Sequence, residues 1–230
     1  MEKVEKTEVK QPVKIIPERD YYKILLVGQS GKGKSYSFRN MNPETTGFIN
    51  VEDKPLPFKN KFKHHKRINA YTEVFSTIIE YVKNPEINAI CIDSLSAFME
   101  LILVEARKTK RNFDIWNMYN EEIGKFLTYV KKVPKEVFLT AHYEILGIEG
   151  AQEKRVKVKG KEFEGQVEKE FTMVLYADSK TGEYGKPKYS LNLYQEGTSA
   201  KCPPGIFDDN SLTIDNDSNF ILNKVLDFVK

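Results

Sequence analysis

The segment that most constrains this chain is GQSGKGKS, at residues 28–35. It follows the apolar run Tyr22 to Val27, which fits a buried strand. A helix should start near Gly33 and end before Pro43. The segment matches G-x-x-x-x-G-K-[ST] in full, a glycine-rich turn whose main-chain N–H groups favour bound phosphate. A chance glycine loop is the alternative, but few such loops would lie between a strand and a helix.

The sequence therefore predicts a nucleoside-triphosphate site, with ATP and Mg²⁺ as the cofactors. Lys34 can reach the β- and γ-phosphates, and Ser35 can bind Mg²⁺ through its hydroxyl. The residues expected to contact the nucleotide are Gly28, Gln29, Ser30, Gly31, Lys32, Gly33, Lys34, Ser35 and Tyr36.

A phosphate loop of this kind needs an acidic partner for the metal and a group that handles water. Asp93 closes the apolar run Ala89 to Ile92, and we expect it to serve the metal directly or through water. An aspartate in this position can also simply cap a helix. Glu52 and Asp53 follow the predicted strand at residues 47–51, which makes them the candidates for orienting or deprotonating the attacking water.

The first 140 residues alternate strand and helix, which predicts a parallel sheet with helices on both faces. Further strands are expected at 47–51, 68–71, 87–92 and 137–141, and helices at 72–83, from 94 or 96 toward 108, and from 114 to before 134. Later strands are expected at 148–158, 163–176 and 189–194, before a final helix at 220–229. We therefore expect a flexible arm at 1–20 and one α/β domain at 21–230, with a hairpin region at about 143–195.

Composition narrows the class of protein. The chain is 40% hydrophobic and 30% charged, as in an ordinary soluble domain. No apolar stretch approaches the roughly 20 residues that span a bilayer, and MEKVEKTEVK at the N-terminus has no apolar signal core. We expect a cytoplasmic protein without a membrane partner.

The net charge of +3 is small, but the basic residues gather in three runs. The runs are 59–67, 107–111 and 154–161. Solvated surface explains any one of them, whereas all three together favour a polyanion partner.

Two segments carry a family resemblance. Phe48 to Asp53 (FINVED) resembles the strand-plus-glutamate segment of RecA-type recombinases, in which the glutamate activates water. The strand ending at His142, with Thr140 before it, is similar to one in phage RecA-like ATPases, a group that includes single-strand annealing proteins. The resemblance covers roughly residues 21–194. It implies a RecA-like P-loop core in which Glu52 is the catalytic base, Lys34 assists catalysis and His142 senses the γ-phosphate. A solvated glutamate and a structural histidine are the alternatives.

The resemblance also implies partners. Single-stranded DNA would meet the loops at 107–111 and 154–161, with Phe113, Tyr143 or Phe163 stacking on bases. Trp116 is expected in the core. The protein would act in phage recombination or replication in the host cytoplasm, with other proteins of those processes, and would assemble into a ring or filament. Lys186 or Lys188 would complete a neighbouring subunit's site.

Two other functions stay open. One is an annealing or interaction module in which ATP is a switch with little hydrolysis. The other is a small-molecule phosphotransferase, whose arginine-rich lid the segment after Arg107 could imitate.

Overall fold

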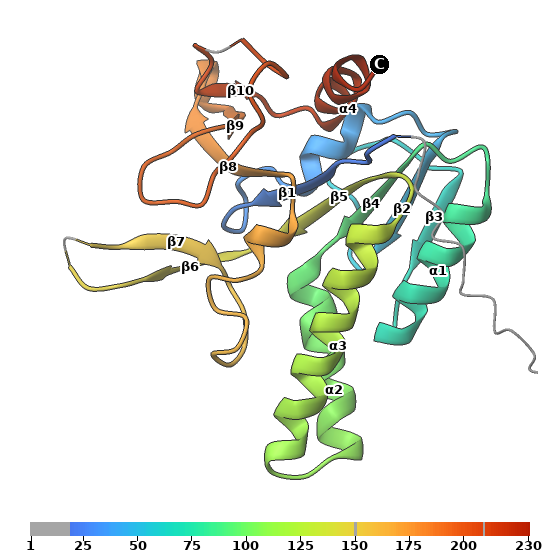
Figure 1. Ribbon diagram of the computed structural model, residues 1–230. Helices are drawn as coiled ribbons and strands as arrows, with labels where there is room; N and C mark the ends of the chain where they lie inside the picture. The colour runs from blue at the N-terminus through green and yellow to red at the C-terminus, as the bar shows by residue number, and fades with distance from the viewer. Residues whose placement is uncertain (1–18, 150, 209) are drawn as a thin grey trace, which may run out of the picture.

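A computed structural model describes residues 19–149, 151–208 and 210–230, so nearly all of the expected N-terminal arm lies outside the described residues. Within them, eight strands form one sheet in the order β10-β9-β8-β1-β5-β4-β2-β3 (Figure 1). These strands are β1 (Lys23–Val27), β2 (Thr46–Asn50), β3 (His64–Arg67), β4 (Ala89–Asp93), β5 (Glu136–Ala141), β8 (Met173–Thr181), β9 (Pro187–Asn192) and β10 (Thr213–Asp215).

The middle of the sheet is parallel. β1 lies between β5 and β8, β5 pairs with β4, and β4 pairs with β2, all in parallel. Since parallel strands end at one edge, the residues after β1, β2, β4 and β5 meet there. β9 and β10 then extend the sheet in antiparallel fashion. The predicted fold class, a mainly parallel sheet flanked by helices and continued by antiparallel strands, is confirmed.

Helices cover both faces of this sheet because its central strands are apolar on both sides. One face packs against α1 (Tyr71–Lys83), α2 (Leu95–Thr109) and α3 (Phe113–Lys132). The other packs against the short 3₁₀ helix η1 (Ser35–Asn40) and α4 (Ser218–Phe228). No helix of the described residues is long and apolar enough to cross a bilayer.

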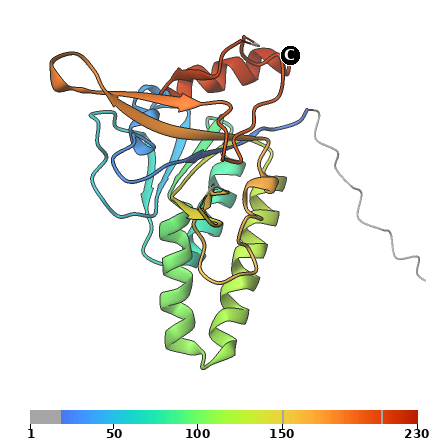
Figure 2. The same cartoon turned by 90° about the vertical axis from the view of Figure 1, so that its left-hand side faces the viewer.

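Three features project from this core. α2 and α3 run side by side well past the end of the sheet (Figures 1 and 2). The antiparallel pair β6 (Tyr143–Leu146) and β7 (Glu153–Val156) follows β5 as a separate hairpin. The β8–β9 hairpin, whose tip contains the 3₁₀ turn η3 (Glu183–Gly185), extends to the side in Figure 2.

The helix expected after the phosphate loop is shorter and tighter than predicted. η1 has six residues and 3₁₀ geometry. Ser37 explains part of this, since its hydroxyl donates to the Lys34 carbonyl at 2.6 Å and its N–H is shared between the Gly33 and Lys34 carbonyls at 3.0 and 3.2 Å. Serine side chains that bond to nearby carbonyls compete with regular α-helical bonding.

The prediction of a strand at residues 68–71 is wrong. The edge strand is β3, four residues earlier, and Tyr71 already begins α1. β3 has the polar sequence HHKR, so no apolar pattern marks it. An edge strand needs only main-chain pairing with one neighbour, here β2, and its side chains can stay polar.

The predictions of strands at residues 148–158 and 163–176 are also wrong over much of their length. Only Glu153–Val156 and the residues from Met173 onward are strands, and residues 168–170 form the 3₁₀ turn η2. Gly160 and Gly165 have φ of +76° and +66°, a backbone conformation that ends strand pairing. Trp116, expected in the core, is 39% exposed and packs edge-on against Tyr119.

Candidate active site

The segment GQSGKGKS forms the loop between β1 and η1. Gly31 and Gly33 adopt φ of +76° and +85°, which only glycine adopts without strain. The main-chain N–H groups of Gly31, Gly33 and Lys34 find no acceptor among the residues that the structure describes. Unpaired N–H groups in such a turn form a concave anion site. The loop therefore fits the phosphates of a nucleotide.

A cavity of about 550 Å³ lies over this loop. Its walls come from the loop and the start of η1, from the segments after β2 and β5, and from the β8–β9 hairpin: Ser30, Gly31, Gly33, Lys34, Ser35, Tyr36, Glu52, Lys54, Pro57, His142, Lys186, Pro187 and Tyr189. An ion pair of 2.9 Å between Lys32 and Asp178 joins the loop to β8. Gly28 and Gln29 stand at the start of the loop, and Gly28 N–H donates to the Ala141 carbonyl at 3.0 Å.

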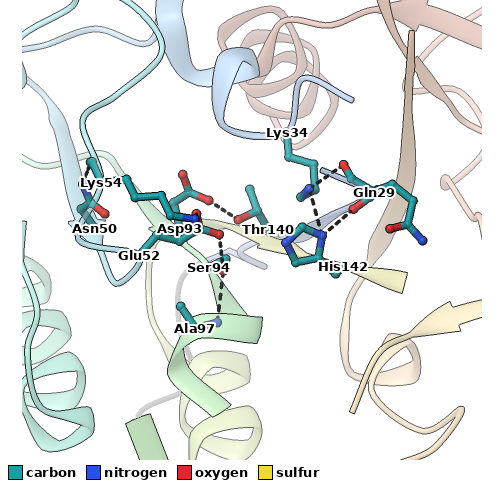
Figure 3. Close-up of polar contacts among 11 residues, drawn as sticks. Gln29, Lys34, Asn50, Glu52, Lys54, Asp93, Ser94, Ala97, Thr140 and His142 are labelled. Carbon is teal, nitrogen blue, oxygen red and sulfur yellow. Dashed lines mark hydrogen bonds and ion pairs between the residues drawn. The ribbon is translucent and has the colours of Figure 1, made fainter. Parts of the chain in front are cut away.

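Lys34 is held inside the loop and is only 7% exposed. Its ammonium donates to the Gln29 carbonyl at 3.0 Å and lies 3.4 Å from Nδ1 of His142 (Figure 3). Burial lowers the pKa of Lys34, while the Asp93 and Glu52 carboxylates oppose that effect. The side chain thus presents its charge toward the cavity that the loop encloses.

His142 follows β5 and faces the loop. Its main-chain N–H donates to the Ser96 hydroxyl at 3.0 Å, and Nδ1 lies 3.2 Å from the Gly28 carbonyl oxygen. A carbonyl only accepts and an ammonium only donates, so the Gly28 contact requires a hydrogen on Nδ1 whereas the Lys34 contact requires its lone pair. Burial and then the Lys34 charge lower the pKa of His142, which keeps the ring neutral near pH 7. With the hydrogen on Nδ1, Nε2 accepts from water; with the hydrogen on Nε2, that nitrogen can donate to a phosphate.

Asp93 closes β4 and is 5% exposed. Thr140 on the neighbouring strand donates its hydroxyl to Oδ1 of Asp93 (Figure 3). Burial raises the pKa of Asp93, and hydrogen bonds from Thr140 and Ser35 oppose the increase. The hydroxyl of Ser35 and the carboxylate of Asp93 are oxygen donors of the type that Mg²⁺ prefers.

No cluster of three or more His, Cys, Asp or Glu side chains able to hold a metal occurs in the described part of the chain. Mg²⁺ is usually bound through one or two carboxylates, with water and substrate phosphates as its other ligands. Ser35 and Asp93 would hold it.

Glu52 lies two residues beyond β2, at the same edge of the sheet. Its Oε1 accepts from the Ser94 hydroxyl at 3.0 Å, and its Oε2 accepts from the Lys54 ammonium at 3.2 Å (Figure 3). Burial alone would raise the pKa of Glu52, but these two hydrogen bonds and the Lys54 charge bring it below the ordinary value. Glu52 is thus a fixed carboxylate, able to accept a proton from water. Asp53 instead turns outward to an ion pair of 3.5 Å with Arg67.

A second cavity, of about 720 Å³, adjoins the first. Ser30, Glu52, Lys54 and His142 line both cavities. The remaining walls come from the phosphate loop, the residue after β2, α2, β6 and the segment after β7: Gln29, Val51, Ser96, Ala97, Met99, Glu100, Leu101, Tyr143, Glu144, Lys157 and Lys159. A molecule in the second cavity would therefore lie beside the groups that face the nucleotide.

The structure brings together Lys34, Ser35, Glu52, Asp93 and His142, all predicted from the sequence. Sequence reasoning missed the groups that orient them. Ser94 caps α2, since its hydroxyl accepts from Ala97 N–H at 3.2 Å. Its bond to Glu52 and the bond from His142 to Ser96 depend on strand order, for which the sequence carries no local signal.

Comparisons with known proteins identify the family. The sequence matches the AAA domain family over residues 20–202, which is most of the chain. No curated protein matches it significantly. The matched range includes the phosphate loop, Glu52, Asp93 and His142. The chain therefore belongs to the AAA domain family, and its sheet and phosphate loop are those of a nucleotide-binding P-loop ATPase.

Proposed function

We propose that this protein is a RecA-like ATPase of phage type that binds Mg²⁺–ATP, hydrolyses it and acts on single-stranded DNA in recombination or replication. The observation that carries the proposal is the position of Glu52. It is a hydrogen-bonded carboxylate in the wall between a phosphate cavity and a second, larger cavity.

In hydrolysis, Glu52 accepts a proton from the attacking water, and Ser94 and Lys54 hold its two oxygens in place. Lys34 places a positive charge beside the phosphates, where negative charge grows in the transition state. Bound Mg²⁺, held through Ser35 and Asp93, would supply further neutralisation of phosphate charge. His142 links the site to α2 through the bond from its main-chain N–H to Ser96.

The second cavity supports a nucleic-acid partner. Lys157 and Lys159 provide cations there, and Tyr143 provides an aromatic ring. Lys159 already pairs with Glu100 at 3.1 Å, whereas no acidic group lies within 4.0 Å of Lys157 in the described part of the chain. Phosphate contacts by lysine and base stacking on aromatic rings are the two sources of affinity for single strands. Tyr143 and Phe163 are both partly buried against the core, whereas Phe113 is 82% exposed.

The three basic runs differ in how far they are neutralised. In the first, Lys63, Lys66 and Arg67 form ion pairs with acidic neighbours. At the tip of the α2–α3 projection, Arg107 and Arg111 have no acidic partner within 4.0 Å among the described residues. This tip and the second cavity are therefore the surfaces that we propose for DNA.

We also propose that the protein assembles into a ring or filament and works with other recombination or replication proteins. Both proposals rest on the RecA resemblance alone. Lys186, which by that resemblance would complete the site of a neighbouring subunit, lines the nucleotide cavity of its own chain. Lys188 lies farther along β9.

A small-molecule phosphotransferase is the second candidate, and the same cavity favours it. A space of about 720 Å³ beside Glu52 could hold a phosphoryl acceptor, whose hydroxyl Glu52 would deprotonate. An annealing or interaction module with ATP as a switch would use the same cavities with little turnover.

The test is ATP turnover with and without single-stranded DNA at two salt concentrations, for the wild type, Lys34→Ala and Glu52→Gln. DNA-stimulated phosphate release that both substitutions abolish supports the proposal. Weak hydrolysis that Glu52→Gln leaves unchanged supports the switch module. No DNA binding at low salt refutes both DNA functions.

A further inference from the structure

Residues 216–218, which join β10 to the first residue of α4, contact the phosphate loop and η1 directly. Ser218 donates its hydroxyl to the Ser37 hydroxyl at 2.9 Å, and Asn40 donates to the Asp217 carboxylate at 2.6 Å. Arg39 donates to the Asn216 carbonyl. This segment lies more than 170 residues from the loop in sequence and beyond residues 20–202, where the family match ends.

Within this segment, Asn216 contacts the loop itself. The residue is 2% exposed, and its Nδ2 donates to the Gly33 carbonyl at 2.8 Å. The Asn216 amide also occupies the space beside the Gly33 Cα, because a Cβ added to Gly33 would lie 2.6 Å from Nδ2. The other contact there is the ring of Tyr189, also at 2.6 Å.

The Gly33 carbonyl belongs to the same peptide unit as the Lys34 N–H. In a planar trans peptide the C=O and the N–H point in opposite directions. Donors from Asn216, at 2.8 Å, and from the Ser37 N–H, at 3.0 Å, hold this carbonyl on one side. The Lys34 N–H therefore points to the other side, where the described residues offer it no acceptor and where Gly33 and Lys34 line the nucleotide cavity.

We propose that Asn216 is a positioning residue for the nucleotide phosphates, an inference that rests on the proposed ATP site. By fixing the Gly33–Lys34 peptide, Asn216 keeps one phosphate-binding N–H aimed at the ligand before the ligand arrives. Without that bond only the Ser37 N–H holds the Gly33 carbonyl, so the peptide is less constrained and nucleotide binding must supply more of the ordering.

The experiment compares Asn216→Ala, Asn216→Asp and Ser218→Ala in the full chain. Asn216→Asp keeps the shape but replaces the donor with an oxygen that repels the Gly33 carbonyl. Ser218→Ala removes a buried bond between the same segment and η1 without touching the Gly33–Lys34 peptide, so it is the matched control. For each variant, calorimetric titration gives the Kd for Mg²⁺–ATP and for ADP, turnover gives KM and kcat, and urea unfolding without nucleotide gives stability.

We expect both Asn216 variants to bind ATP and ADP about three- to tenfold more weakly, the worth of one hydrogen bond. KM should rise by the same factor, with kcat at saturating ATP within twofold. Ser218→Ala should lose stability while its Kd stays within twofold of the wild type.

The proposal is overturned if Asn216→Ala and Asn216→Asp bind nucleotide as tightly as the wild type. It is also overturned if the Kd of all three variants follows their loss of stability alone. Failure of the wild type to bind ATP would instead refute the nucleotide site itself, so the two failures are distinguishable.

Discussion

Replacing Thr140 with valine tests the metal side of the site. Thr140 is fully buried on β5, and its hydroxyl donates to Oδ1 of Asp93, which is 5% exposed. Valine has almost the same shape but no donor, so the substitution removes one hydrogen bond and leaves packing intact. A hydrogen bond to a buried charged group contributes about 1.5–3 kcal/mol. We expect the free energy of unfolding to fall by about that amount.

The same bond keeps the pKa of Asp93 down against the effect of burial. Its loss should raise that pKa further, and a metal ligand must be ionised to bind. Thr140→Val should therefore need more Mg²⁺ for half-maximal ATP turnover, most clearly at the acidic end of the working pH range. The measurements are urea unfolding and a Mg²⁺ titration of turnover at two pH values.

Thr46→Val is the control, because Thr46 is 1% exposed on β2 but pairs with Ala89, at the opposite end of β4 from Asp93. Thr46→Val should leave the Mg²⁺ requirement unchanged. If Thr140→Val also leaves both stability and the Mg²⁺ requirement at wild-type values, Asp93 is not held as a metal ligand by this bond.

Three other substitutions probe the loop, the histidine and the second cavity. In Gly33→Ala the new Cβ would lie 2.6 Å from atoms of Asn216 and Tyr189, on a backbone with a φ of +85°. We expect titration to show at least a tenfold loss of ATP affinity, and unchanged affinity would contradict the loop geometry. The pKa of His142 is below its ordinary 6.5 in the folded chain, so the unfolded chain binds more protons just below pH 6.5 and stability falls on acidification. In His142→Gln that part of the pH dependence of unfolding should vanish, and an unchanged pH profile would show that His142 is not held neutral. Lys157→Ala with Lys159→Ala should weaken single-strand binding and reduce its salt dependence, as measured by fluorescence anisotropy, and an equal salt slope would exclude these lysines.

Much of the site could be predicted because its signals are local. The loop 28–35 carries its own pattern, and Asp93 and Glu52 each close a short apolar strand. Residues at the ends of parallel strands must gather at one edge of the sheet, so strand ends alone bring them together.

What could not be predicted depends on contacts between distant segments. Asn216 reaches Gly33 only because α4 docks against η1, and the polar segment around it has no pattern that reveals this. Edge strand β3 was misplaced because main-chain pairing with β2 alone defines it. Trp116 lies on an apolar helical stripe, but α2 and α3 extend beyond the sheet and leave this side chain partly uncovered.

The central claim is that Glu52 is the base for ATP hydrolysis at this phosphate loop. The most direct measurement is single-turnover hydrolysis of Mg²⁺–ATP by Glu52→Gln, beside ATP affinity measured by titration. Asp53→Asn is the matched control, because Asp53 is the neighbouring carboxylate and faces Arg67 instead. The account predicts that Glu52→Gln binds ATP within about threefold of the wild type and hydrolyses it about 10²–10⁴-fold more slowly, while Asp53→Asn is unaffected. Hydrolysis by Glu52→Gln at the wild-type rate would contradict it.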